Sequence, residues 1–324
     1  MSTIPPEVSW PLSALGRLDV GRIQWNAPLA QHSSWRIGGP ADLLVEPDSV
    51  EQIERLVQFV SAEGIPLVVI GQGTNLLFDD AGVRGVVLKL GSGFARVEVE
   101  GNRISAEAGL WVPQLARLAM RSGLAGLEHC IGIPGTLGGL VLMNGGSRRR
   151  AIGENVRRIR LVDPRGKLCE LYAAECDFSY RHSNLAARGI VVGVELDCPH
   201  GEPEAIRREM ICDLRERRYK FPRKIPNCGS VFLSTAEMHA SVGPPGKIIE
   251  EAGLKGARRG DAEVSQLHAN FILNRGQAAS ADVLTLIRHI RRTIRRDLDF
   301  ELLCEVRYVS PGGEIRPAHL AAES

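Results

Sequence analysis

Apolar residues recur at the three- and four-residue spacing of an α-helix in several segments of the chain. In the clearest segment, one helical face carries Val50, Ile53, Leu56, Val57 and Val60. Asp48 and Glu51 predict a capping-box pair at the start of this helix, and Gly64 predicts its end. The same spacing predicts helices over residues 112–122, from residue 206 onwards and over residues 282–298.

Short apolar runs bounded by turn residues predict strands. They cover residues 66–70, 86–90, 103–108, 159–163, 168–172 and 190–197. Because helices and strands are mixed without regular alternation, the pattern predicts an α+β fold. The polar stretch "CPHGEPEA" predicts a domain boundary near residue 200, and beyond it we expect alternating helices and loops.

Two glycine-rich segments interrupt this pattern. "GQGTN", residues 71–75, follows a predicted strand, and "GIPGTLGGLVLMNGG" covers residues 132–146. Glycine allows positive φ and close approach of other atoms to the main chain, so such segments form either tight corners or a cradle for a ligand. Interleaved apolar residues argue against a disordered linker. From the residues alone, corner and cradle are equally good interpretations.

Two nucleotide-binding motifs are excluded by the residues that follow the first glycines. A G-x-G-x-x-G motif would need glycine where the chain has Leu76, and a turn and a strand follow where that motif requires a helix. A P-loop would need serine or threonine after Lys247, but Ile248 stands there.

Charge and composition limit the class of protein. With 40 basic and 38 acidic residues in 324, the net charge is +2, so we expect no nucleic-acid partner. No apolar run approaches the roughly 20 residues of a membrane span, and the start lacks the pattern of a signal peptide. We therefore expect a cytoplasmic protein with no membrane partner. The tail after Ser310 is expected to be poorly ordered.

Charged and metal-binding side chains give little further signal. The arginines of the last predicted helix are expected to form a solvated face: Arg288, Arg291, Arg292, Arg295 and Arg296. Seven cysteines with no C-x-x-C spacing predict reduced thiols. The eight histidines have no metal-binding spacing, so we expect no metal site.

Seven polar motifs lie where the periodic pattern gives no structural reason for them. In chain order they are "SSWRIGGPADL", "GQGTNLL", "GIPGTLGG", "FSYRHS", "NCGSVF", "HANFILN" and "CEVRYV". Together, from about Ser33 to about Val309, they resemble the UDP-N-acetylenolpyruvoylglucosamine reductase family of bacterial peptidoglycan precursor synthesis. The link from Ser183 to the strand predicted at residue 190 is too short for a long tyrosine-bearing loop, so the resemblance is to the subtype that lacks it.

The resemblance implies an architecture. It is the FAD-binding PCMH-type fold shared with vanillyl-alcohol oxidases, an α+β module of two subdomains, followed by a C-terminal substrate-binding α+β domain. On this chain, the FAD-binding domain would cover residues 21–200, with subdomains of about 21–90 and 91–200. The substrate-binding domain would cover residues 201–309, between an N-terminal extension, 1–20, and a tail, 310–324.

The resemblance also implies an activity. NADPH would reduce noncovalently bound FAD, which would reduce UDP-N-acetylglucosamine enolpyruvate to UDP-N-acetylmuramate. Adding hydride to the enolpyruvyl ether drives negative charge toward the carboxylate, and the adjacent carbon then needs a proton. Such an oxidoreductase serves cell wall biogenesis, cell shape and cell division. Its partner would be this small-molecule substrate, and we expect a monomer or weak dimer.

Cofactor contacts follow from the same resemblance and favour the ligand cradle. Main-chain N–H groups can hold the FAD diphosphate without lysine. The implied cofactor-binding residues are Arg36, Gly71, Gly73, Thr74, Asn75, Leu76, Gly132, Pro134, Gly135, Thr136, Gly138, Gly139 and Asn144. For Gly145 and Gly146 the structural and ligand interpretations stay equally open.

Three residues match the family's catalytic groups. Arg181 would stabilise the developing enediolate, for which a planar and permanently charged guanidinium is suited. Ser230 would donate the proton, and Glu305 would help to stabilise the intermediate through hydrogen bonds.

Substrate contacts are implied less firmly. They would rest on Tyr180, Lys220, Ser234 and Asn270, with Lys220 as a diphosphate contact. The chain departs from the family where Leu233, Ser234 and Thr235 follow the serine motif, so Ser234 is at best a substitute for a nucleotide contact. It also has Leu303 where relatives commonly carry a second glutamate.

Two alternatives stay open. A flavin-dependent oxidase of the same fold would use His129 or Cys130, beside the second glycine segment, to link the flavin. A nucleic-acid-binding protein would use "RERRYKFPRK" and the last helix, although the near-neutral net charge speaks against it.

Overall fold

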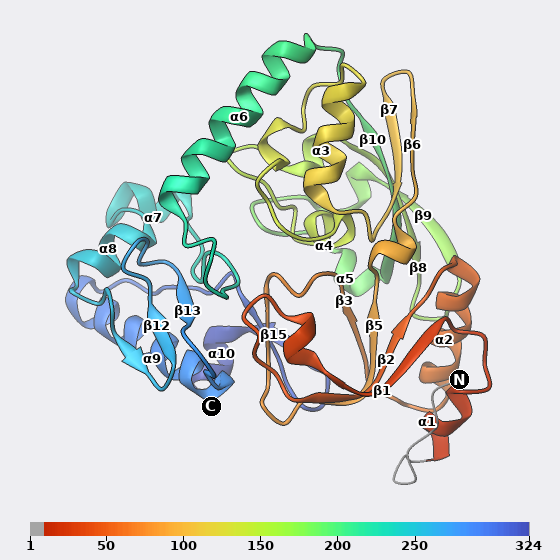
Figure 1. Cartoon of the computed structure of the whole chain (residues 1–324), viewed down its shortest axis with the longest axis horizontal. Coiled ribbons are helices and arrows are strands. Elements are labelled where there is room, and N and C mark those ends of the chain that lie inside the picture. The colour runs from red at the N-terminus through yellow and green to blue at the C-terminus, as the bar shows by residue number, and fades with distance from the viewer. Residues whose placement is uncertain (1–9, 324) are drawn as a thin grey trace. The chain divides into compact units, whose positions relative to one another are not determined.

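The chain forms two compact units, each assembled from three separate segments. The computed structural model describes residues 10–323, so residues 1–9 of the predicted N-terminal extension lie outside the described part (Figure 1). Unit 1 comprises residues 10–25, Leu43–Gln72 and Val86–Arg217. Unit 2 comprises Asn26–Asp42, Gly73–Gly85 and residues 218–323. Three of these boundaries fall within strands, one falls in the loop after Gln72 and one falls within a helix. The predicted domain boundary near residue 200 stays a prediction.

Helices and strands are mixed along the chain, which confirms the α+β prediction. The longer helices of unit 1 are α2 (Val50–Ala62), α3 (Val112–Arg121) and α6 (Pro203–Lys220), and its short ones are α1 (Trp10–Leu15), α4 (Leu137–Leu142) and α5 (Leu185–Arg188). Unit 2 contains α7 (Ala236–Ser241), α8 (Pro245–Glu251), α9 (Ser280–Leu298) and α10 (Ala318–Ala322). Short 3₁₀ turns are η1 (Leu29–His32), η2 (Ser92–Phe94), η3 (Glu128–Cys130), η4 (Ile152–Glu154) and η5 (Ala173–Glu175).

Helix α2 forms where the apolar spacing predicts it, but its cap is one residue later. Ser49 is the N-cap, and its hydroxyl accepts a hydrogen bond from the Gln52 N–H at 3.3 Å. The Gln52 side chain accepts in return from the Asp48 N–H at 2.7 Å. The predicted pairing of Asp48 with Glu51 is therefore wrong, because Ser49 and Gln52 form the reciprocal cap one position later.

A four-stranded sheet has the order β1-β2-β5-β3, with β1 Arg22–Pro28, β2 Pro40–Glu46, β5 Val83–Lys89 and β3 Leu67–Ile70. Strands β3 and β5 run parallel. The element after "GQGTN" is strand β4 (Leu76–Phe78), not a helix, which confirms the exclusion of the dinucleotide-binding motif.

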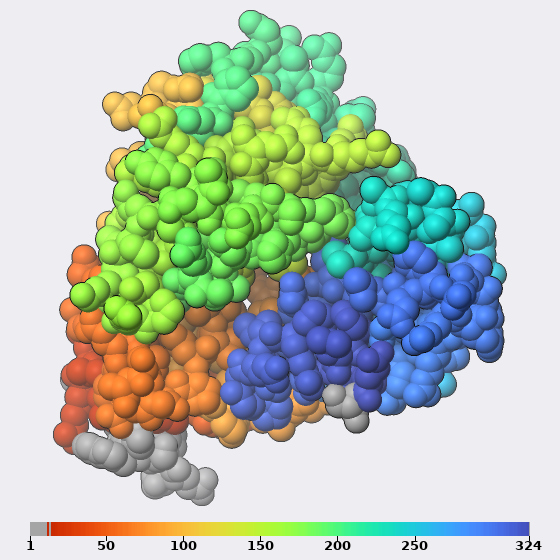
Figure 2. Space-filling view, turned by 180° about the vertical axis from the view of Figure 1, so that it is seen from behind, coloured from red at the N-terminus to blue at the C-terminus, as the bar shows by residue number. Residues whose placement is uncertain are grey.

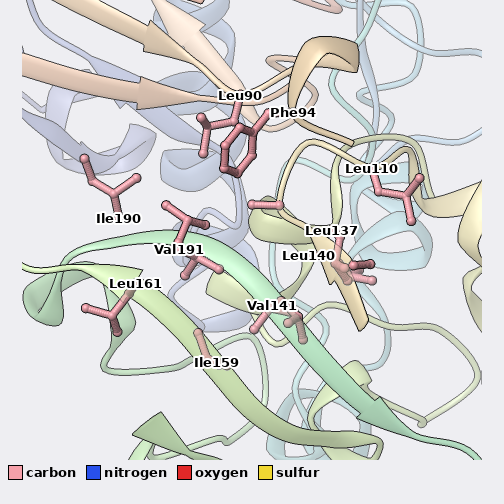
Figure 3. Packing of buried hydrophobic residues seen from close by; sticks show 14 of the residues in the cluster. Leu90, Phe94, Leu110, Leu137, Leu140, Val141, Ile159, Leu161, Ile190 and Val191 are labelled. Carbon is pink, nitrogen blue, oxygen red and sulfur yellow. The ribbon is translucent and has the colours of Figure 1, made fainter. Parts of the chain in front are cut away.

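A five-stranded antiparallel sheet lies in unit 1 and supports the second glycine segment. Its order is β6-β7-β10-β8-β9, with β6 Val97–Glu100, β7 Arg103–Glu107, β10 Ile190–Asp197, β8 Val156–Val162 and β9 Leu168–Tyr172. The apolar residues between the glycines are buried in this unit's core, where Leu137, Leu140 and Val141 lie in one cluster with Ile159 and Val191 (Figure 3). The interleaved pattern of that segment therefore has a packing reason.

Unit 2 has its own core and two small sheets, which the expectation of only helices and loops missed. One sheet is β11-β12-β13, with β11 Arg258–Arg259, β12 Ala262–Val264 and β13 Ile272–Asn274. The other is β15-β14-β4, in which β14 (Arg307–Val309) pairs antiparallel with β15 (Ile315–Pro317) and parallel with β4. Strands of two or three residues are too short to show a period in the sequence.

Helix α9 buries its predicted apolar face, namely Val283, Leu286, Ile287, Ile290 and Ile294. The expected solvated arginine face is wrong at two positions. Arg288 donates to the Ala322 carbonyl at 3.3 Å, and Arg291 donates to the Leu302 carbonyl at 2.8 Å and pairs with Glu323. Only the remaining three arginines of that set, Arg292, Arg295 and Arg296, are exposed.

The segment after Ser310 is ordered, so the expectation of a poorly ordered tail is wrong. Residues 315–317 form β15 and residues 318–322 form α10, and Ala318 and Ala322 belong to the core of unit 2. Figure 2 shows this last segment, in dark blue, against lighter blue residues of the same unit.

Among the helices that the structure describes, none has both the length and the apolar character needed to cross a membrane.

Candidate active site

The end of strand β3 and the second glycine segment touch in unit 1. A Cβ on Gly71 would lie 2.2 Å from the Thr136 hydroxyl, so only glycine permits this approach. Thr136 is buried and forms an antiparallel bridge with Trp111, the residue before α3. The structure thus brings together two motifs that are 65 positions apart in the sequence.

The main chain of the second glycine segment is fixed by hydrogen bonds to the segment before α3. The Gly138 N–H donates to the Ala108 carbonyl and the Leu137 N–H to the Leu110 carbonyl, both at 2.8 Å. A Cβ on Gly138 would lie 2.9 Å from the Ala108 Cβ. Several glycines of this segment are therefore required by packing alone.

Part of the same segment is open to solvent. Pro134 and Gly139 are exposed, and a Cβ on Gly139 would meet only the Thr136 hydroxyl, at 3.6 Å. Gly135, between them, has φ +120°, a conformation that suits glycine. Exposed main chain on a fixed backbone is what a cradle for FAD requires. The predicted FAD contacts of Gly71, Gly132 and their neighbours stay predictions.

Arg181 lies at the tip of a tight turn in unit 1. Ser179 and His182 exchange two main-chain hydrogen bonds of 3.1 Å across this turn. Arg181 has φ +55°, in the left-handed region that disfavours residues other than glycine by about 1–2 kcal/mol. Its guanidinium carbon lies 5.3 Å from the centre of the exposed Tyr180 ring. A strained arginine is held in place by its surroundings.

Three hydrogen bonds fasten the arginine turn to the glycine segment. The Asn144 amide donates to the Ser179 carbonyl at 2.8 Å, and the Ser183 hydroxyl donates to the Leu142 carbonyl at 2.7 Å. Arg181 itself donates to the Gly146 carbonyl at 2.9 Å.

The last two glycines of the segment, Gly145 and Gly146, are also required by close packing. A Cβ on Gly146 would lie 1.9 Å from the Arg150 carbonyl oxygen, and one on Gly145 would lie 2.6 Å from the Leu140 side chain. Asn144, at φ +43°, accepts from the Gly153 N–H at 3.0 Å. Its amide therefore braces the arginine turn, and its predicted FAD contact stays a prediction.

His129 and Cys130 are buried in the core of unit 1. Both side chains are at most 1% exposed, and the His129 Nε2 lies 3.3 Å from the Cys130 sulfur. Burial, with a smaller effect of the Arg150 charge, lowers the pKa of His129 to about 4. Burial raises the pKa of the Cys130 thiol to about 12. At neutral pH both groups are uncharged and inaccessible to solvent.

In unit 2 the main chain brings Ser230 and Glu305 together. The Glu305 N–H donates to the carbonyl of Val231, the residue after Ser230, at 2.8 Å. Phe232 and Cys304 form the antiparallel bridge of this pairing. Both candidate side chains are half-buried. The two predicted catalytic residues, 75 positions apart in the sequence, thus lie in one frame, namely the paired segments around residues 231 and 305.

Asn270 braces that frame from the side. Its amide oxygen accepts from the Phe232 N–H and its amide nitrogen donates to the Phe232 carbonyl, both at 2.9 Å, while its main-chain carbonyl accepts from the Val231 N–H at 2.8 Å. The side chain is 4% exposed. These hydrogen bonds give Asn270 a structural role that needs no ligand. The predicted substrate contact of Asn270 stays a prediction.

The end of the first glycine motif belongs to the same frame. The Asn75 amide donates to the Glu305 carbonyl at 3.1 Å, and Leu76 is paired with Arg307 in the parallel strands β4 and β14. Gly73 has φ +60°, and a Cβ there would lie 2.0 Å from the His32 carbonyl oxygen. "GQGTN" is therefore shared, with Gly71 in unit 1 and residues 73–75 in unit 2.

Sequence reasoning missed a second brace of the glutamate. The Cys304 N–H donates to the Nδ1 of His319 at 3.0 Å. His319 lies in the segment after Ser310 that was expected to be poorly ordered. Burial lowers the pKa of His319, which keeps the ring neutral and able to accept. Nothing in the local sequence around His319 signals this contact.

The remaining predicted contacts lie in unit 2. Arg36 is exposed in a turn with φ +58°, and Thr74 is half-buried. Lys220 is the exposed last residue of α6, and Ser234 shares a hydrogen bond of 2.8 Å with the His239 ring. Their roles in binding stay predictions.

Two family descriptions match the chain in separate regions. The UDP-N-acetylenolpyruvoylglucosamine reductase C-terminal domain matches residues 221–309, and the FAD binding domain matches residues 41–172. The matches include the Ser230 and Glu305 motifs in the first region and both glycine segments in the second.

Whole-length relatives agree with these matches. The UDP-N-acetylenolpyruvoylglucosamine reductase 1 of Corynebacterium glutamicum is 46% identical over 303 residues, which are 93% of this chain and 90% of that protein. The reductase of Moorella thermoacetica is 41% identical and covers 93% and 99%. The crystal structure of UDP-N-acetylenolpyruvylglucosamine reductase from Thermus caldophilus aligns with a TM-score of 0.75 at 32% identity over 89% of this chain and 98% of that one. By sequence and by fold, the chain belongs to the UDP-N-acetylenolpyruvoylglucosamine reductase family.

Proposed function

We propose that the chain is an FAD-containing oxidoreductase that uses NADPH to reduce UDP-N-acetylglucosamine enolpyruvate to UDP-N-acetylmuramate, a step of peptidoglycan precursor synthesis. Membership of the family supports the reaction. One observation carries the assignment to this chain's own residues: a strained arginine is fastened by three hydrogen bonds to the second glycine segment, whose exposed main chain is the proposed place for FAD.

The cofactor would lie along the exposed main chain of the second glycine segment. Pro134, Gly139 and the turn at Gly135 would hold the flavin nucleotide. When bound, FAD supplies the carrier that accepts hydride from NADPH and delivers it to the enolpyruvyl group. The hydrogen bonds that fix this backbone would thereby orient the ligand.

The three catalytic candidates would share the remaining work. Arg181, always charged, would hold the negative charge that develops at the substrate carboxylate, and the turn presets its direction. Ser230 would deliver the proton to the adjacent carbon from its hydroxyl. Glu305 is linked to Ser230 through the Val231 carbonyl, so both would move as one frame.

Substrate binding would involve exposed or half-buried groups near these frames. Tyr180 packs on Arg181 within unit 1, and Lys220 offers a cation for the diphosphate in unit 2. Ser234 would be a weak nucleotide contact. Asn270 would act mainly by holding the Ser230 segment, because its amide is already bonded to Phe232.

The domain limits are part of the proposal. We assign residues 21–200 to the FAD-binding domain and residues 201–309 to the substrate-binding domain, which is supported by the regions of the two family matches. We further propose a cytoplasmic location, a role in cell shape and division, and a monomer or weak dimer. Sedimentation of the purified protein at several concentrations would test the last point.

The oxidase alternative receives no support from its two candidate linkage residues. Both His129 and Cys130 are buried, and the raised pKa of the thiol keeps it protonated. Denaturation of the purified protein in acid should leave yellow flavin in the supernatant. Flavin retained in the pellet would favour a covalent linkage and the oxidase.

The decisive experiment separates the two half-reactions. We expect purified protein to be yellow with FAD, and Ser230→Ala to be reduced by NADPH at near the normal rate. Reoxidation by the enolpyruvyl substrate should slow by about 10²–10⁴-fold, as expected on losing a positioned acid. Arg181→Lys should show the same selectivity, because lysine keeps the charge but loses the planar fork.

Ser241→Ala is the matched control, since Ser241 is an exposed serine of the same unit. It should leave both half-reactions unchanged. A Ser230→Ala enzyme that reoxidises with substrate at the normal rate would show that the proton comes from another group. Absence of flavin, or FMN in its place, would contradict the proposed function itself.

A further inference from the structure

Three consecutive arginines, Arg148–Arg150, follow directly after the second glycine segment. The Arg150 N–H donates to the Ser147 carbonyl at 3.0 Å and closes a four-residue turn. Arg148 has φ +54° and Arg149 has φ +63°, so both central residues are left-handed, as in a type I′ turn. Glycine, asparagine and aspartate dominate such positions, so both arginines are held in a backbone conformation that their side chains disfavour.

The turn is fixed at both ends to the segment that positions Arg181. The Ser147 hydroxyl donates to the His129 carbonyl at 2.7 Å, and the Ile152 N–H donates to the Gly145 carbonyl at 2.9 Å. The carbonyl of Gly146 accepts from Arg181. Gly146 and Arg149 are three positions apart in the sequence, so their Cα atoms lie at most about 11 Å apart.

Two of the three arginines have acidic partners within unit 1. Arg148 pairs with Asp213 at 2.5 Å and with Glu216 at 2.8 Å, both on α6. Arg150 contacts the buried carboxylate of Glu128 at 3.2 Å and Glu209 at 3.4 Å. These ion pairs neutralise the flanking charges and hold the turn.

Arg149 differs from both neighbours. It is exposed, and its guanidinium makes no ion pair or hydrogen bond with any residue of the described range 10–323. The ion pairs of Arg148 and Arg150 thus hold the turn in which Arg149 lies. Arg149 is a cation without an acidic partner in the described range, at a strained backbone position close to the turn that carries Arg181. Strain that the surroundings enforce is a reason to look for a function.

We propose that Arg149 binds a phosphate group of a nucleotide that enters this site. A guanidinium forms paired, charge-assisted hydrogen bonds with phosphate oxygens, and a phosphate monoester carries close to two negative charges at neutral pH. The inference rests on the proposed function, which brings two phosphate-bearing reactants to Arg181 in turn. The 2′-phosphate of NADPH and the diphosphate of the UDP-sugar are the two sources of this chemistry.

The test compares NADPH, NADH and the UDP-sugar substrate with wild type and Arg149→Ala in stopped-flow half-reactions. If the 2′-phosphate is bound, the apparent dissociation constant for NADPH should rise about tenfold and that for NADH should not change. If the diphosphate is bound, only the value for the UDP-sugar should rise by that factor. Arg149→Lys should recover part of the loss, because it keeps the charge without the fork.

Two further variants make the result specific. Arg149→Gly should lose nucleotide affinity as Arg149→Ala does, yet melt at a higher temperature than Arg149→Ala because glycine accepts positive φ. Arg165→Ala, an exposed arginine in another turn of unit 1, should change nothing.

Unchanged constants for all three ligands in Arg149→Ala would overturn the inference, as would an equal loss for all three, which would indicate a disturbed turn. Wild-type protein that neither accepts hydride from NADPH nor passes it to the UDP-sugar would instead contradict the proposed function, independently of Arg149.

Discussion

The turn that carries Arg181 and the segment that carries Ser230 are both braced by a buried asparagine, but their backbones differ. Asn144 holds the arginine turn and Asn270 holds the serine segment, each through its amide. Arg181 lies at φ +55°, whereas Ser230 is not among the residues with positive φ. One catalytic candidate is therefore held against backbone strain, and the other is not held in the left-handed region.

The difference shows two ways of fixing a side chain. In the serine segment, main-chain pairing between residues 231 and 305 supplies the order, and the asparagine completes it. In the arginine turn, side chains of Asn144, Ser183 and Arg181 make the contacts themselves. Removing one brace should therefore affect overall stability more in the serine segment, where the groups left behind are buried.

The largest effect is expected from Asn270→Ala. The variant leaves the N–H and the carbonyl of buried Phe232 without partners, and each unsatisfied buried group costs about 1–3 kcal/mol. We expect the free energy of unfolding to fall by about 4 kcal/mol, measured by urea denaturation. Reoxidation of the flavin by the substrate should slow with it, because the Ser230 segment loosens.

Asn102→Ala provides the control for Asn270, since the side chain of this exposed turn asparagine makes no hydrogen bond within residues 10–323. It should change stability by less than about 0.5 kcal/mol. An Asn270→Ala protein of normal stability whose affinity for the UDP-sugar alone is reduced would mean that Asn270 is a substrate contact and not a brace.

Much of the fold was predictable where elements are long and periodic. Helices α2, α3 and α9 and strands β8, β9 and β10 lie where the apolar spacing predicts them, within a few residues. The strands of unit 2 and the ordered C-terminal segment were missed. Their order comes from pairing with distant residues, such as β15 with β14, and from small buried side chains that carry little hydrophobic signal.

The candidate site was predictable as a set of motifs but not as an arrangement. The resemblance predicted Arg181, Ser230 and Glu305 as catalytic residues, but the motifs do not show what the residues around them contact. Asn270 bonds to Phe232, 38 positions away, and His319 bonds to Cys304 from a segment expected to be poorly ordered. Such contacts depend on long-range pairing, which one sequence does not reveal.

Acid should affect the glycine segment through His129. Burial lowers the pKa of its side chain from 6.5 to about 4, so the unfolded chain takes up a proton that the folded chain refuses. The contribution of neutral His129 to the free energy of unfolding is fully present above pH 6.5. It is lost as the pH falls toward 4, by about 3 kcal/mol in total. Urea denaturation at pH 7 and pH 4.5 should show His129→Gln losing less stability between the two values than wild type.

The control for His129 is His200→Gln, an exposed histidine of the same unit, which should lose as much stability on acidification as wild type. Equal acid sensitivity of His129→Gln and wild type would show that His129 does not sense pH in this range.

Asn144→Gly should have a smaller effect than Asn270→Ala. It removes the hydrogen bonds to the Ser179 carbonyl and the Gly153 N–H, but water can reach the exposed Ser179, and glycine tolerates φ +43°. We expect a loss of about 2 kcal/mol in unfolding free energy. The oxidative half-reaction should slow more than reduction by NADPH, because Arg181 loses its fixed direction. Equal slowing of both half-reactions would instead indicate a defect in flavin binding.

The smallest effect tests the comparison most directly, because it predicts opposite signs at the two positions. At Arg181, with φ +55°, the glycine variant should be more stable than the alanine variant by about 1 kcal/mol, since alanine keeps the left-handed strain. At Ser230, glycine should be less stable than alanine by about 0.5–1 kcal/mol, because its unfolded chain has more freedom to lose. Comparing glycine with alanine at one position cancels the loss of the native side chain, so only the backbone differs. Thermal and urea denaturation of the four variants would measure both differences. An alanine variant at position 181 that is at least as stable as the glycine variant would show that Arg181 is not strained in the folded protein, and that the two regions hold their catalytic candidates in the same way.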